Sequence, residues 1–63
     1  MIPYDIYVDK YDENYILVRC HRDYVFAVQT TMLEKEYYII DIEYAGDFVF
    51  MYMMKLTPQE KGE

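Results

Sequence analysis

Two adjacent residues, Cys20 and His21, are the first in this sequence whose types could do nucleophilic chemistry. A thiolate attacks a carbonyl carbon when a neighbouring imidazole accepts its proton. On an extended strand successive side chains leave opposite faces, so these two groups do not meet. His21 is the single histidine, and no Gly-rich turn offers an oxyanion hole. We therefore expect a buried thiol at Cys20, a solvated His21 and no catalytic residue.

The residues present do not support a metal site or a glycosidase active site. A structural zinc site needs four thiolate or imidazole ligands, and the chain has two. The acidic residues around Asn14 lack the central glycine and terminal glutamate of a calcium-binding EF-hand loop. Two carboxylates of different pKa could cleave a glycosidic bond, but 63 residues are too few to form the walls of a sugar-binding cleft. The sequence predicts a non-enzymatic protein with no metal and no cofactor.

The balance of charge is the strongest chemical signal in the chain. Twelve Asp and Glu stand against six Lys and Arg, which gives a formal net charge of -6 at pH 7. Such a charge repels nucleic acid and anionic lipid and favours a basic partner. We expect that partner to contact two acidic groups and two tyrosines: Glu34, Glu36, Asp41, Glu43, Asp47, Asp5, Asp9, Tyr7 and Tyr37.

The length of the chain limits what can hold these residues in place. A domain of 63 residues buries only about 60% of the surface that its unfolded chain exposes. Apolar residues make up 54% of the chain, too many for a disordered tail, and a single cysteine excludes an internal disulfide. We therefore expect self-association, with a homodimer as the simplest form. No long apolar run and no signal-peptide start are visible, which predicts a soluble, cytoplasmic protein without a membrane contact.

Short runs rich in Tyr, Val, Ile and Phe are typical of an antiparallel sheet. The predicted strands cover residues 4–10, 15–20, 24–33, 37–44 and 48–56. In the fourth run, alternation places Tyr38, Ile40, Ile42 and Tyr44 inward and the acidic residues outward. Asp12-Glu13-Asn14 and Ala45-Gly46-Asp47 predict turns. We expect a mainly β domain over residues 1–56, built as a five-stranded meander or small open barrel.

Residues 24–33 support a second structure. Val25, Val28 and Met32 recur at helical spacing behind Asp23, a good helix N-cap, whereas the β-branched residues of the segment favour a strand. We favour the strand, and a helix would give an α+β fold of order ββαββ. The remaining residues 57–63 form a short polar tail that opens with a capping-box pattern, Thr57-Pro58-Gln59-Glu60.

The fifth run is apolar on both faces of a strand. Phe48, Phe50 and Tyr52 alternate with Val49, Met51 and Met53. A strand of this kind is covered on both sides, and so short a chain has little material for a second layer. We therefore expect an oligomer interface formed by Val49, Met51 and Met53.

Rows of like charge such as Asp41 with Glu43 repel one another, so we look for a function that they serve. One function is to keep a tyrosine-rich sheet in solution. The other is imitation of DNA phosphates, which blocks the basic groove of a nucleic-acid-binding protein. In size, charge and composition the chain resembles the small acidic inhibitors carried by bacteriophages, which implies a basic host protein as the target.

The nine tyrosines support a binding role, because tyrosine gives rigid contact area at low entropic cost. Our hypothesis is a non-enzymatic inhibitor of a basic host protein, with DNA mimicry as its mechanism. The main alternative is a structural or adaptor subunit of an oligomer, whose acidity serves solubility only. A toxin or antitoxin component is a third class, on size alone. Strong loss of affinity with added salt is expected for the inhibitor and not for an apolar subunit contact.

Overall fold

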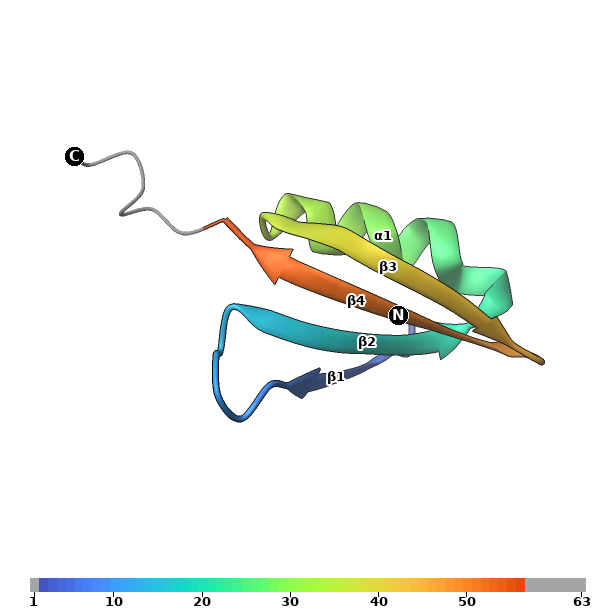
Figure 1. The fold of residues 1–63 in the computed structure, drawn as a ribbon. Helices are drawn as coiled ribbons and strands as arrows, with labels where there is room; N and C mark the ends of the chain where they lie inside the picture. The colour runs from blue at the N-terminus through green and yellow to red at the C-terminus, as the bar shows by residue number, and fades with distance from the viewer. Residues whose placement is uncertain (1, 57–63) are drawn as a thin grey trace.

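The computed structural model describes residues 2–56, which form a four-stranded antiparallel sheet and one α-helix (Figure 1). The elements along the chain are β1 (Asp5–Val8), β2 (Tyr15–His21), the 3-10 turn η1 (Arg22–Tyr24), α1 (Val25–Glu34), β3 (Tyr37–Ala45) and β4 (Phe48–Lys55). The mainly β class is confirmed. Residues 24–33 contain the helix of the ββαββ alternative, so the five-stranded meander is wrong. The predicted tail and its capping box lie outside the described residues.

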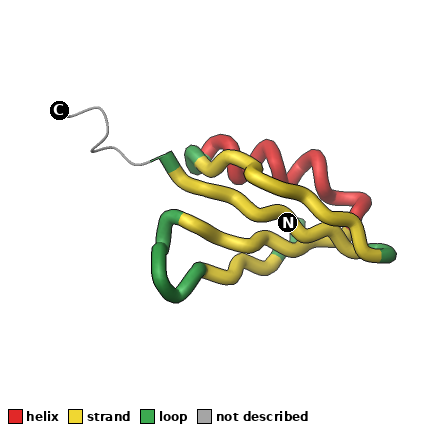
Figure 2. The backbone as a smooth tube through the Cα atoms, in the orientation of Figure 1, coloured by secondary structure: helices red, strands yellow, loops and turns green. Residues whose placement is uncertain are grey.

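The strands lie in the order β1-β2-β4-β3, so β4 is central although it comes last in the described chain. β4 pairs antiparallel with β2 on one side and with β3 on the other, which makes β2 and β3 parallel to each other. α1 connects these two strands across one face of the sheet (Figure 2). As a result, β1 and β3 are the two edge strands.

The core lies between α1 and the sheet face that it covers. Val28 and Met32 of the helix are 1% and 0% exposed. Opposite them are buried side chains of the two central strands, Ile16, Val18, Cys20, Val49, Met51 and Met53. Burying one such aliphatic side chain is worth roughly 1.5 to 3 kcal/mol, whereas a β-branched residue in a helix costs less than about 1 kcal/mol. Packing therefore outweighs the strand preference of residues 24–33.

Val49, Met51 and Met53 belong to this core, so the prediction that they form an oligomer interface is wrong. None of the three is more than 1% exposed within the single chain. The second layer that covers them is α1, which the five-strand interpretation left out. The uncovered face of β4 is the opposite one, with Phe48, Phe50 and Tyr52.

A bulge in β3 changes which of its residues share a face. The pairing with β4 shifts between Ile39 and Asp41, and Ile40 is the extra residue. Before the bulge Tyr38 lies opposite Met54, on the uncovered face, whereas after it Ile42 lies opposite the buried Met51. The predicted alternation, which put Tyr38 and Ile42 on one face, is therefore wrong.

Both predicted turns are present. The Asn14 backbone N–H donates to Asp12 Oδ1 at 3.0 Å, and the Tyr15 N–H donates to the Asp12 carbonyl at 3.0 Å. Gly46 closes the β3–β4 hairpin with a φ of 64°, in the left-handed region that glycine tolerates. The helix start differs from the prediction, since Tyr24 and not Asp23 is the N-cap. Residues 2–56 include no helix long and apolar enough to cross a membrane.

Candidate binding face

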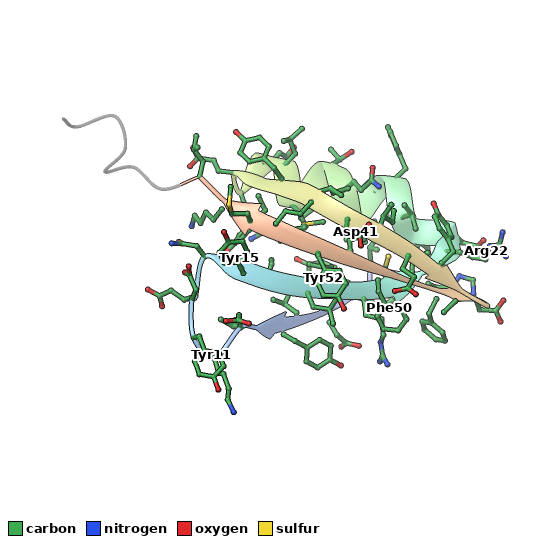
Figure 3. The ribbon with its side chains drawn as sticks, viewed as in Figure 1. Tyr11, Tyr15, Arg22, Asp41, Phe50 and Tyr52 are labelled. Carbon is green, nitrogen blue, oxygen red and sulfur yellow. The ribbon has the colours of Figure 1, made fainter. Side chains whose placement is uncertain are left out.

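The sheet face turned away from α1 carries a group of exposed aromatic side chains. We call this surface the open face; its residues are Asp5, Tyr7, Tyr15, Leu17, Arg19, His21, Tyr38, Asp41, Glu43, Phe48, Phe50, Tyr52 and Met54. Phe48 and Tyr52 of the central strand are 44% and 45% exposed. Figure 3 shows Tyr15, Phe50 and Tyr52 in front of the strands, with α1 behind them. No described segment of the chain covers these rings.

The register arranges the open face in rows that cross the four strands. One row runs Tyr7, Leu17, Tyr52 and Asp41 from β1 to β3. The next row runs Asp5, Arg19, Phe50 and Glu43. Both rows are aromatic on β4 and end in a carboxylate on β3. The open face therefore has an apolar centre with an acidic border along one edge strand.

Arg19, the arginine of the open face, is engaged by two neighbours. Its Nη2 donates to Asp5 Oδ2 at 2.7 Å, and its Cζ lies 5.3 Å from the centre of the Phe48 ring. The side chains of Arg19 and Asp5 are 40% and 51% exposed, so water screens this pair and it adds no more than about 1 kcal/mol. Within residues 2–56, Asp41 and Glu43 form no salt bridge. The border on β3 thus keeps its negative charge.

A pocket opens in the open face beside the β1–β2 connection. It has a volume of about 340 Å³. The open-face side chains that line it are Tyr7, Tyr15, Leu17 and Tyr52, and we call this group the tyrosine pocket. Asp9 and Lys10 also line it, from the connection between the two strands. The three tyrosine hydroxyls make no hydrogen bond to any part of the chain that the structure describes.

Four of the predicted partner-binding residues are on the open face, two on each of its opposite edge strands, β1 and β3. They are Asp5, Tyr7, Asp41 and Glu43. Since the first of these is paired with Arg19, the unpaired charge comes from the two residues on β3. These four residues share one face of the sheet but are separated across it by β2 and β4.

The other predicted residues lie elsewhere. Glu34 ends α1, Glu36 occupies the turn after it with a φ of 70°, and Asp47 lies in the β3–β4 turn. Asp9 lies in the β1–β2 connection and lines the tyrosine pocket from there. Tyr37 is half-buried on the covered side, packed against the core. The acidic stretch from residue 34 to 47 is continuous in sequence but does not form one surface.

Sequence reasoning missed the aromatic centre of the open face. The signal was available in the fifth run, where Phe48, Phe50 and Tyr52 alternate with smaller and softer side chains. Val49, Met51 and Met53 pack closely under a helix, whereas a tyrosine needs water or a partner for its hydroxyl. When a strand is apolar on both faces, the face that carries tyrosine is therefore the one expected to stay uncovered.

Cys20 and His21 leave opposite faces of β2, as expected. Cys20 is 3% exposed, and burial raises the pKa of its thiol. His21 Nδ1 accepts a hydrogen bond from the Asp23 backbone N–H at 3.1 Å and lies 3.5 Å from Asp23 Oδ2. The described residues contain no group of three or more His, Cys, Asp or Glu that could hold a metal ion. Within residues 2–56 no base lies beside the thiol, so this pair gives no support to nucleophilic chemistry.

Comparison of the chain with protein-family models, with curated proteins and with solved structures finds no match to any of the three.

Proposed function

We propose that this chain is a non-enzymatic binding protein that docks its open face onto a basic protein surface. The observation that carries this proposal is the aromatic centre of the open face, bordered on β3 by Asp41 and Glu43. A contiguous apolar patch with a polar rim is typical of a protein interaction site. Exposed tyrosine and phenylalanine add contact area that loses little side-chain entropy on binding.

Charge selects the kind of partner. Two copies of this chain each carry a net charge of -6, so they repel at long range, and pairing them through the open face adds the repulsion of Asp41 and Glu43. A basic partner instead gains attraction from the same carboxylates and is steered toward them. We therefore favour a basic protein over a second copy as the occupant.

Docking inhibits the partner where the covered surface is its own functional site, such as a groove that binds DNA. Mimicry of DNA requires more of the acidic residues than docking does. An array of phosphate-like charges draws on Glu34, Glu36 and Asp47 as well as on the two open-face carboxylates. Docking through the open face does not require Glu34, Glu36 or Asp47, because these three residues lie outside that face. The two mechanisms can therefore be separated by substitution.

Two double substitutions remove the same charge from different places. Asp41→Asn with Glu43→Gln neutralises the border of the open face, and Glu34→Gln with Glu36→Gln neutralises two carboxylates outside it. A partner isolated from a lysate with the wild-type chain is then titrated with all three proteins by calorimetry, at low and moderate salt. We expect the open-face variant to weaken binding by about 1 to 3 kcal/mol, and the matched control by less than about 0.5 kcal/mol.

Each other result favours a different mechanism. Equal losses in both variants indicate a contribution from the whole acidic stretch, as mimicry requires, and contradict docking through the open face. No loss in either variant means that the acidity serves solubility only. Affinity that stays constant between the two salt concentrations supports a structural subunit. Circular dichroism of all three proteins checks that the fold is unchanged.

A further inference from the structure

The tyrosine pocket places three aromatic rings around an apolar floor. Leu17 lies directly between Tyr7 on β1 and Tyr52 on β4, since all three residues share one row of the register. The spacing of paired strands puts the two tyrosine Cα atoms about 9 to 10 Å apart, which leaves room for a flat group between the rings. Tyr15, two residues from the floor on the same side of β2, supplies the third wall.

These rings hold no cation of the chain itself. The cation–ring contacts within residues 2–56 use the rings of Tyr11, Tyr37 and Phe48, none of which lines the pocket. Lys10 does line the pocket, but its Nζ lies 5.6 Å from the centre of the Tyr11 ring. The faces of the three pocket rings therefore remain available to a cation from outside.

One carboxylate lines the tyrosine pocket and a second lies beside it, while Lys10 is the one cation in its lining among residues 2–56. Asp9 lines the pocket, and its Oδ2 is held by the backbone N–H groups of Tyr11 and Asp12 at 2.9 and 3.0 Å. Its Oδ1 makes no hydrogen bond within the described part of the chain. On the other side, Asp41 lies opposite Tyr52 in the register. Ring faces and carboxylates both attract cations, so the pocket suits a positive group.

We propose that the tyrosine pocket binds an arginine side chain of the basic partner, an inference that rests on the proposed docking of the open face. The guanidinium group is planar, stacks on aromatic rings and keeps N–H donors along its edge. Those donors match the carboxylate of Asp9 and the tyrosine hydroxyls. The ammonium group of lysine is compact and more strongly hydrated, so it gains less between the rings.

Three short peptides test this site without the partner. N-acetyl-Gly-Arg-Gly-amide, its lysine analogue and its citrulline analogue are titrated into isotope-labelled protein and followed by NMR. We expect the arginine peptide to shift resonances of Tyr7, Tyr15, Leu17 and Tyr52. The lysine peptide should do so less, and citrulline, which keeps the shape and loses the charge, should not. Equal shifts with citrulline, or shifts centred outside the pocket, would overturn the proposal.

Substitutions at one ring give the matched comparison. Tyr52→Leu removes a pocket ring, Tyr52→Phe keeps the ring and removes the hydroxyl, and Tyr38→Leu removes an open-face tyrosine outside the pocket. We expect Tyr52→Leu to weaken binding of the arginine peptide about two- to fivefold, and the other two to change it less. Equal losses in Tyr52→Leu and Tyr38→Leu contradict the pocket. The backbone spectrum of each variant shows whether it is folded.

The two proposals fail in different ways. If partner binding responds to Asp41→Asn with Glu43→Gln but the arginine peptide leaves the pocket unperturbed, docking stands and the arginine site is refuted. If the peptide perturbs the pocket but partner binding ignores the open-face substitutions, docking is refuted. Shifts of the same resonances that grow with protein concentration, without peptide, identify a second copy as the occupant and overturn the arginine site.

Discussion

Replacing Met51 with alanine tests which face of β4 belongs to the core. Met51 is fully buried beneath α1, opposite Val18 and Ile42 in the register. Core substitutions of this kind cost about 2 to 5 kcal/mol, because they lose buried surface and leave a cavity. Flexible neighbours such as Met32 and Met53 can relax into part of the space, so we expect the lower end, about 2 to 3 kcal/mol.

The matched control is Met54→Ala, three residues along the same strand. Met54 lies on the open face, opposite Tyr15 and Tyr38, and is only partly buried. Its truncation leaves no enclosed cavity, and we expect a cost of about 1 kcal/mol or less. The two variants lose the same atoms, so the difference between their free energies of unfolding measures the effect of burial beneath α1.

Urea unfolding followed by far-UV circular dichroism measures both variants. A domain of 63 residues has a total free energy of unfolding of about 3 to 9 kcal/mol and a urea slope near 1 kcal/mol per molar. The midpoint should therefore fall by about 2 to 3 M for Met51→Ala and by less than about 1 M for Met54→Ala. An equal or larger fall for Met54→Ala would refute the assignment of the core to the Met51 face.

Two further predictions concern stability. Gly46 has a φ of 64°, and a Cβ there meets no atom within 4 Å, so Gly46→Ala should cost about 1 kcal/mol from backbone strain alone, measured by the same unfolding experiment. Gly46→Asn should cost less than Gly46→Ala. Equal free energies of unfolding for the wild type and the two variants would contradict this reasoning. Burial raises the pKa of the Cys20 thiol above its ordinary 9.0, so the unfolded chain loses this proton first as the pH rises. The stability that this proton gives is complete below pH 9.0 and declines above it, and the decline should be shallower in Cys20→Ala when midpoints are compared across a pH series.

The parts of the fold that the sequence predicts are those with local causes. The turn at Asp12-Glu13-Asn14 depends on a side-chain to backbone hydrogen bond within the turn, and the turn at Gly46 depends on a backbone conformation that glycine adopts easily. The first predicted strand, residues 4–10, likewise contains β1. These features need only neighbours in the chain, so one sequence is enough to identify them.

The helix and the bulge depend on partners that are distant in sequence. Residues 24–33 carry both a helical spacing and β-branched residues, and the outcome is decided by the apolar sheet face that α1 covers. A prediction that misses this helical layer assigns the covered face of β4 to an oligomer interface and overlooks the face that is in fact open. The bulge at Ile40 has no glycine or proline to mark it. It is visible only in the pairing with β4.

Only part of the candidate site could be predicted, for the same reason. Asp41 and Glu43 alternate on one strand, so their common face follows from local geometry. Glu34 and Glu36 are their neighbours in sequence, but the end of α1 and the turn after it carry them off the open face. The aromatic centre depends on β2 and β4 lying side by side, a pairing between segments that are far apart in the chain.

The central position of β4 also affects how this protein is made. During synthesis β1, β2, α1 and β3 are made before the strand that joins β2 to β3. Until then those two strands have no partner between them, and the core lacks Val49, Met51 and Met53. Folding of this domain must therefore wait until residue 55 has been translated, and a nascent chain that ends after β3 exposes two unpaired edges to other chains.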